Sequence, residues 1–224
     1  MIGQKLEKES FMWQMWQYGL IAEEIPNCFS SSQFAANYET LNAFLQKTFS
    51  TSPTTLSTYK SETARRNVSV PNPYAFANTV QYLGKRYSEL MSLAYSPNSD
   101  SPITFIHSYG DWEVEAINSG IARNALRAFS DFKASIRRRM SLAMGYRYRL
   151  SVDIATFYDA IYTHSLSWSI CGKEAAKRMF EGIDKKNSKY LFADQLDKRI
   201  RNQKGQETSG VLTGPYTSRI FSEL

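Results

Sequence analysis

The sequence has few of the residues that build disulfide-linked or metal-bound scaffolds, and it has no long apolar run. Two cysteines, Cys28 and Cys171, and two histidines, His107 and His164, are too few for a disulfide framework or for the usual Cys/His zinc cage. No apolar stretch approaches the roughly 18 residues needed to cross a bilayer. The first ten residues lack the basic and then apolar layout of a signal peptide. We therefore expect a soluble, cytoplasmic protein without a membrane partner.

Apolar and aromatic side chains, by contrast, are present in the amounts of a folded domain. Of the 224 residues, 42% are hydrophobic and 14% are aromatic, which is enough to bury a core in one or two domains. The net charge of +6 is concentrated, because residues 121–150 hold eight basic side chains against one acidic side chain, Asp131. This concentration predicts a polyanionic partner.

The first half of the chain has a pattern that is mainly helical. Residues 1–50 are predicted to be helical, with a first helix that ends at Pro26. The Ser/Thr-rich stretch 48–63 is expected to be a linker or exposed loop, and the stretch 64–76 is expected to hold a short strand and a turn. A helix is predicted over 74–93, and a loop follows it.

The second half begins with the basic segment. Residues 121–145 place apolar side chains three or four apart, which predicts an amphipathic helix terminated by Gly145. Residues 146–162 begin as an alternation of apolar and polar residues and become apolar, the profile of a strand entering a core. Helices are predicted over 173–182 and 193–203, and 205–224 is expected to be a glycine-rich loop leading into a helix.

One carboxylate, Asp153, stands at the end of that predicted strand. Its burial there would be costly without a cation or hydrogen bonds to compensate the charge. Asp153 is therefore either a metal ligand for phosphoryl or nucleotidyl transfer or the cap of the following helix. The pattern alone leaves both interpretations open.

Two stretches carry a resemblance to a known family. VDIATFYDAIYTHSLSWSICGKEAAK (152–177) resembles motif A of reverse transcriptases, and its YTHS…W…GK continuation is typical of the abortive-infection branch of bacterial defence-associated enzymes. GQETSGVLTGPYTSRIFSEL (205–224) resembles motif B, although Leu212 and Tyr216 replace the usual Pro and Asp. Upstream, 64–76 is similar to the fingers segment of the branch, and 22–31 is similar to its N-terminal region.

The resemblance implies an α+β fold with the helix-rich fingers and partial palm of a right-hand polymerase, the reverse-transcriptase fold. It divides the chain into an N-terminal helical region (1–60), a fingers-like region (61–145) and a partial palm (146–224). The paired-Asp motif C does not occur in the sequence. YLFADQL (190–196) is not that motif, because Gln195 replaces its second Asp and its surroundings are helical.

The resemblance also implies roles for individual residues. Asp153 would be a ligand of Mg²⁺ or Mn²⁺, together with the backbone carbonyl of Ile154. Tyr158 would be the steric gate that favours dNTPs over NTPs; the alternative is an ordinary core aromatic. Arg65 or Arg66 would reach the triphosphate from the fingers, unless these side chains are merely solvated. The loop with Gly210, Gly214 and Pro215 would pack against the nascent base pair and the primer or template backbone.

The basic segment 121–149 would then be a cationic channel wall beside the metal site. Its arginines would bind the phosphates of DNA or RNA, and they are Arg137, Arg138, Arg139, Arg147 and Arg149. Two residues near motif A are expected to have structural roles. His164 is expected to be a structural hydrogen-bonding residue, and Asp159 to face solvent or act as a cap.

The implied function is that of a DNA polymerase of the reverse-transcriptase family acting in anti-phage abortive infection. It would transfer a nucleotide from a dNTP to a 3′-OH or a protein hydroxyl by a two-metal mechanism, with protein-primed, template-independent synthesis and homo-oligomers as properties of the branch. Without motif C, we expect the 224-residue chain to be inactive alone. Two alternatives are a non-catalytic nucleic-acid-binding or assembly protein and a split enzyme completed by a partner chain.

Overall fold

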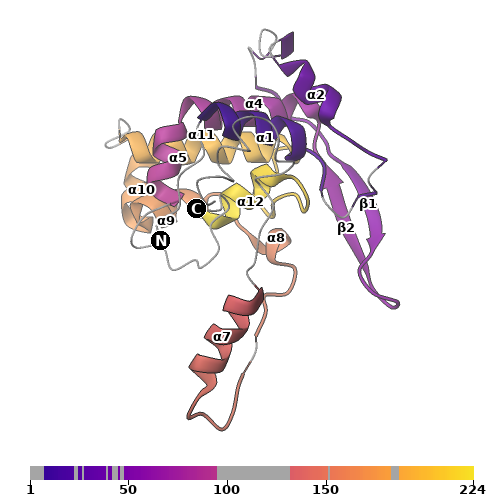
Figure 1. The fold of residues 1–224 in the computed structure, drawn as a ribbon. Helices are drawn as coiled ribbons and strands as arrows, with labels where there is room; N and C mark the ends of the chain where they lie inside the picture. The colour runs from indigo at the N-terminus through magenta and orange to yellow at the C-terminus, as the bar shows by residue number, and fades with distance from the viewer. Residues whose placement is uncertain are drawn as a thin grey trace.

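The computed structural model describes residues 8–22, 25–26, 28–38, 40–41, 45, 48–94, 132–150, 152–182 and 187–224. In these residues the fold mixes many helices with one antiparallel two-stranded sheet, an α+β arrangement (Figure 1). The predicted loop at 96–102 and the first part of the predicted helix 121–145 lie outside the described residues.

The elements of the first half are two helices, a hairpin and two further helices. They are α1 (Lys8–Tyr18), α2 (Ser32–Ala36), β1 (Thr54–Tyr59), β2 (Arg65–Val70), α4 (Pro73–Lys85) and α5 (Tyr87–Ala94). The sequence predicted the strand at β2 and the helical stretch at α4 and α5 correctly. The start of α4 is fixed by Asn72, whose side-chain oxygen accepts a hydrogen bond from the Tyr74 backbone N–H at 2.9 Å, and by Pro73 at the first helical position.

The hairpin corrects the prediction for 48–63. Residues 54–59 are a strand and not a linker, with Thr54 paired to Val70 and Tyr59 paired to Arg65. β1 is almost wholly exposed, so its Ser/Thr-rich composition resembles that of a loop. The β-branched threonines nevertheless suit a strand, and β2 provides the neighbour that orders it.

The second half is helical apart from loops. Its elements are α7 (Phe132–Ala143), α8 (Phe157–Ala160), α9 (Ser165–Cys171), α10 (Lys173–Phe180), α11 (Ser188–Asn202) and α12 (Tyr216–Glu223). The predicted helices at α10, α11 and α12 are confirmed, and so is the helical setting of YLFADQL within α11. Asn187 caps α11, because its side-chain oxygen accepts hydrogen bonds from the backbone N–H groups of Lys189 and Tyr190 at 3.0 and 3.1 Å.

One hydrophobic core holds the helices together. Side chains of α1, α2, α4, α5, α9, α11 and α12 meet in it. The largest side chains without exposure come from α1, α4, α5 and α11, and they are Trp16, Phe11, Phe76, Phe192, Met15, Leu83, Leu90 and Leu196. We call the described residues around this core, together with the hairpin, the body.

A second region projects away from the body (Figure 1). It consists of α7 with residues 144–150 and 152–154, and we call it the arm. The prediction of an amphipathic helix is confirmed over Phe132–Ala143, and Gly145 follows it with a φ of +87°. The predicted strand from residue 146 is not present, because no other strand lies beside it in the described part of the chain. Its apolar side chains therefore stay exposed, and Val152 is 85% exposed.

Candidate nucleotide-binding cavity

The loop from Gly210 to Pro215 joins three parts of the body through its backbone. The Val211 N–H donates to the Tyr158 carbonyl oxygen at 2.8 Å, and the Thr213 carbonyl oxygen accepts from the Ser69 N–H at 2.7 Å. One bond reaches α8 and the other reaches β2. The loop therefore holds the hairpin and the 152–162 segment at a fixed separation.

Two glycines allow this close approach. Gly214 has a φ of +128°, and a Cβ added there would lie 2.9 Å from Val68 Cγ1 and 3.0 Å from the Ser69 carbonyl oxygen. Gly210 has a φ of +78°, and its added Cβ would lie 3.0 Å from the Asp159 carbonyl oxygen. A side chain at either position would be strained and would push the loop from its neighbours.

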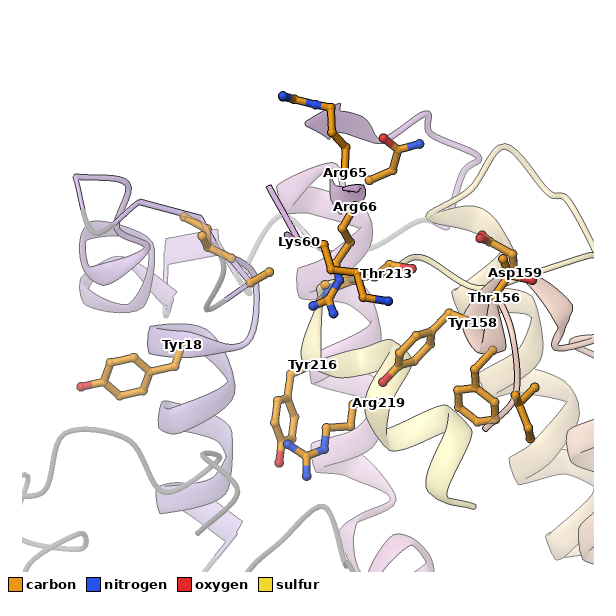
Figure 2. Close-up of a pocket in the computed structure, with 17 residues that line it drawn as sticks. Tyr18, Lys60, Arg65, Arg66, Thr156, Tyr158, Asp159, Thr213, Tyr216 and Arg219 are labelled. Carbon is orange, nitrogen blue, oxygen red and sulfur yellow. The ribbon is translucent and has the colours of Figure 1, made fainter. Parts of the chain in front are cut away.

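The loop, the hairpin and α8 enclose an open cavity of about 610 Å³. Several of the residues that the resemblance singled out line it together, although they are far apart in the sequence: Arg65, Arg66, Ile154, Tyr158, Gly214 and Pro215. The end of α1 and the start of α12 complete the wall with Tyr18, Tyr216 and Arg219 (Figure 2). Gly210 does not line the cavity but holds the loop that does.

The charge of the lining is strongly positive. Lys60, Arg65, Arg66 and Arg219 face one acidic lining residue, Asp159. The two neighbouring arginines of β2 differ, however. Arg65 donates to the Ser57 hydroxyl and to its carbonyl oxygen, both at 2.8 Å, and lies over the Tyr59 ring. Figure 2 shows Arg65 extending away from the cavity, while Lys60 and Arg66 extend toward Tyr216 and Tyr158.

Tyr158 forms the opposite wall. It is half-buried, packs against the core on one side and lines the cavity on the other. Its ring meets Phe157 edge to face with centroids 5.3 Å apart. The preceding Thr156 has a φ of +48°, which is costly for a β-branched residue and forces the chain to turn sharply into α8. Such a turn presents Tyr158 and Thr156 to the same cavity.

Asp153 lies at the base of the arm and is exposed. One of its carboxylate oxygens accepts a hydrogen bond from the Ile154 N–H at 2.9 Å. Exposure removes the burial cost on which the sequence argument rested, and only Ile154 of this pair lines the cavity. Among the described residues, no three His, Cys, Asp or Glu side chains gather as a metal group. The described residues therefore supply one carboxylate, Asp153, of the several that a two-metal site needs.

Four basic side chains of the arm face solvent. Arg137, Arg139, Arg147 and Arg149 are exposed, and Arg138 lies in α7 between the first two. Figure 1 shows the arm leaving the body next to α8, so these arginines lie beyond the cavity and not in its wall.

His164 and Asp159 have the structural positions expected of them. His164 Nδ1 lies 2.7 Å from a carboxylate oxygen of Asp197, whose other oxygen accepts from Arg201 Nε at 3.1 Å. Asp197 is only 4% exposed, so the two partners supply the hydrogen bonds that its burial requires. Asp159 is exposed at the end of the short helix α8. The His164–Asp197 contact ties the start of α9 to α11.

Two cavity cations were missed by sequence reasoning. Lys60 directly follows β1, which the sequence did not predict, so nothing placed it opposite Tyr158. Arg219 lies one helical turn after Pro215, in α12, and its guanidinium is 5.4 Å from the Tyr216 ring. The helical spacing from the glycine loop was the available signal for Arg219.

A comparison with models of known protein families found no matching family, and a comparison with curated proteins found no matching sequence. In the described part of the chain, no helix is long and apolar enough to cross a membrane.

Proposed function

We propose that the cavity binds a deoxynucleoside triphosphate and that the chain is the nucleotide-binding part of a DNA polymerase similar to the abortive-infection reverse transcriptases. One observation carries the proposal: residues of the fingers-like segment 64–76, of the motif A stretch and of the motif B stretch line one cavity. The right-hand polymerase fold and the role in anti-phage defence belong to this proposal through the motif resemblance alone.

The chemistry of the lining suits a nucleoside triphosphate. Lys60, Arg66 and Arg219 can neutralise phosphate oxygens, and arginine can bind such oxygens with two parallel hydrogen bonds. Tyr158 can pack against the sugar and exclude a 2′-OH. The incoming 3′-OH or protein hydroxyl would attack the α-phosphate, and pyrophosphate would leave. Mg²⁺ or Mn²⁺ would lower the charge of the phosphates when bound, with Asp153 and the Ile154 carbonyl as this chain's ligands.

The first test is nucleotide binding by the chain, because it does not depend on catalysis. Binding of dTTP with Mg²⁺ is measured by calorimetry for the parent chain, Arg66→Ala and Arg65→Ala. Arg66→Ala is expected to weaken binding about 10- to 100-fold, the cost of losing a charge-assisted contact. Arg65→Ala is the matched control, because Arg65 is held by Ser57, and its dissociation constant should change less than about threefold. Equal losses in both variants, or no binding by the parent chain, would contradict the proposal.

Sugar selectivity and synthesis test the finer roles. Tyr158→Ala is expected to let UTP bind as tightly as dTTP, and unchanged selectivity would remove the gate role. In a protein extended to a paired-Asp motif, Asp153→Ala is expected to abolish incorporation of labelled dNTPs. Synthesis at the parent rate would show that Asp153 is not a metal ligand.

A second function, non-catalytic nucleic-acid binding, is favoured by the exposed arginines of the arm. It predicts salt-sensitive DNA binding that weakens when Arg137, Arg138 and Arg139 are replaced together by Gln, with the cavity variants unaffected. DNA binding without any dTTP binding would favour this second function over the first.

A further inference from the structure

One wall of the cavity is formed by the start of α12, where Tyr216 and Arg219 line it. The first backbone N–H groups of a helix have no partner within the helix, and the residue before α12, Pro215, gives them no side-chain hydrogen bond. The Tyr216 N–H donates instead to the carbonyl oxygen of Gly19 at 2.8 Å. The first turn of α12 is therefore held by a residue at the end of α1, far from it in the sequence.

Gly19 directly follows α1 and is buried. Its N–H donates to the Met15 carbonyl oxygen at 2.9 Å, which is the spacing of an α-helical hydrogen bond. The carbonyl oxygens at the C-terminal end of a helix have no partner within that helix, so the oxygen of Gly19 can accept the Tyr216 N–H. One hydrogen bond thus satisfies the end of α1 and the start of α12.

The two helix ends come this close because residue 19 has no side chain. A Cβ added to Gly19 would lie 2.7 Å from the Met15 carbonyl oxygen. It would also lie 3.2 Å from Phe76 Cζ and 3.3 Å from Tyr216 Cβ. Phe76 is fully buried in the core, so its ring has little room to give way. An added methyl group would therefore push α12 away from α1 and lengthen the hydrogen bond between them.

We infer that Gly19 is a positioning residue of the nucleotide cavity and acts on the ligand through Arg219. The Arg219 guanidinium lies 5.4 Å from the Tyr216 ring, and both side chains belong to the first turn of α12 (Figure 2). Gly19 itself does not line the cavity, so its effect on the ligand is indirect. The inference rests on the proposed nucleotide binding, in which Arg219 neutralises phosphate oxygens. A displaced first turn would shift this guanidinium relative to the other cations of the cavity.

The alternative is that Gly19 contributes only to the stability of the core. Met15 and Trp16 of α1 are fully buried, and so is Ile220 of α12. A poor fit at residue 19 would therefore also lower the free energy of unfolding. A stability effect alone would leave the dTTP affinity of the folded molecules unchanged. The two interpretations thus differ in the affinity of folded protein and in the cavity cation that carries the effect.

The first test removes the hydrogen bond without crowding residue 19. Proline at the first position of a helix keeps the helix and lacks the N–H, and Pro215 already has the extended backbone, with a ψ of 143°, that a residue before proline adopts. Tyr216→Ala is the matched control, because it removes the same ring and keeps the N–H. In calorimetry with dTTP and Mg²⁺, Tyr216→Pro is expected to bind about 5- to 10-fold more weakly than Tyr216→Ala. Equal affinities of the two variants would overturn the inference.

The second test asks whether the effect passes through Arg219. Gly19→Ala is expected to weaken dTTP binding about 10-fold in the parent chain and in Arg66→Ala. In Arg219→Ala the same change should cost less than about twofold, because the effects of residues that act through one another do not add. The same loss in all three backgrounds would overturn the inference and leave Gly19 a structural role alone.

Gly84→Ala is the control for crowding of α1. Its added Cβ would meet the Met12 side chain of α1, but Gly84 lies in α4 and does not line the cavity. Its dTTP affinity should stay within about twofold of the parent. Circular dichroism shows whether each variant is folded, and the Tyr216 pair decides the question if Gly19→Ala does not fold. No dTTP binding by the parent chain would contradict the proposed function and this inference with it, whereas parent-like binding by folded Gly19→Ala would overturn this inference alone.

Discussion

The body and the arm are built from similar side chains but use them in opposite ways. In the body, α1 buries Phe11, Met15 and Trp16 completely. In the arm, Met140 and the alternating residues from Tyr146 onward remain largely exposed. The difference shows that an amphipathic pattern indicates which face of a helix or strand is apolar, but not which element covers that face. In the body the covering elements are among the described residues, whereas no described element covers the exposed apolar side chains of the arm.

The sharpest way to test this contrast is to remove the same side chain from both regions. Met15 is 0% exposed and Met140 is 65% exposed. Met15→Ala should lower the free energy of unfolding by about 2–5 kcal/mol, because it leaves a cavity in the core, and Met140→Ala should change it by less than about 0.5 kcal/mol. Urea denaturation at a concentration where the parent is monomeric measures both. Equal losses would mean that α7 packs against the body.

Glycine offers a second matched pair. Gly214 and Gly145 both have positive φ, but a Cβ at Gly145 would meet nothing within 4 Å. Gly214→Ala combines backbone strain with overpacking and should cost about 2–4 kcal/mol. Gly145→Ala should strain only the turn after α7 and leave the unfolding midpoint of the body within about 1 °C of the parent. Thermal unfolding followed at 222 nm gives the comparison, and a Gly214→Ala midpoint near that of the parent would contradict the packing described for the loop.

A smaller effect is expected from the buried hydrogen bonds that place α12 against the rest of the body. Gln203 donates to the Thr79 hydroxyl at 2.8 Å and accepts from the Thr217 hydroxyl at 3.2 Å, and all three residues are buried. Gln203→Leu leaves both hydroxyls without this partner and should cost about 1–3 kcal/mol. Gln33→Leu, on the exposed face of α2, is the control. Because α12 carries Arg219, dTTP affinity should fall together with stability only in the Gln203 variant.

The smallest expected effect comes from a surface ion pair of the body. Burial tends to raise the pKa of Glu89, but hydrogen bonds from its own backbone N–H and Ser88, together with the charge of Arg86, leave that pKa below its usual value of 4.5. The Arg86–Glu89 contact of 2.7 Å therefore contributes at neutral pH, and its contribution disappears as pH falls through the lowered pKa. Glu89→Gln should lose no more than about 0.5 kcal/mol at pH 7 and nothing at pH 2, measured by urea denaturation at both values. A larger loss at pH 2 than at pH 7 would contradict a stabilising role of the ionised Glu89 side chain.

Sequence reasoning succeeded where local signals and burial agree. The helices α4 and α11 have caps at Asn72 and Asn187, and their apolar positions follow a helical period, so their location could be predicted. β1 could not be predicted, because an exposed strand of threonine and serine has a loop's composition and is ordered only by β2. The prediction of a strand within 146–162 was wrong for the opposite reason, since the pattern is that of a strand but no described strand lies beside these residues.

The residues of the candidate site could also be predicted only in part. The motif stretches indicated Tyr158, Gly214 and Pro215, and these residues line one cavity. The sequence could not choose between Arg65 and Arg66, because that choice depends on Ser57 and Tyr59 across the hairpin. Lys60 lines the cavity because the hairpin turn follows β1 at that point, and Arg219 lines it because α12 packs beside the loop. Both placements depend on how distant parts of the chain pack, which the sequence does not show.

The walls of the cavity are joined by main-chain atoms. The bonds from Ser69 to Thr213 and from Val211 to Tyr158 use only N–H and carbonyl groups, which every residue except proline supplies in full. Apart from the glycines, side chains around the cavity can therefore be exchanged without removing the bonds that set its width. During evolution these main-chain bonds can be kept while the side chains, and with them the ligand preference of the cavity, change. Leu212 and Tyr216, in and beside the loop, could be exchanged in this way, because the bonds from Ser69 to Thr213 and from Val211 to Tyr158 use neither side chain.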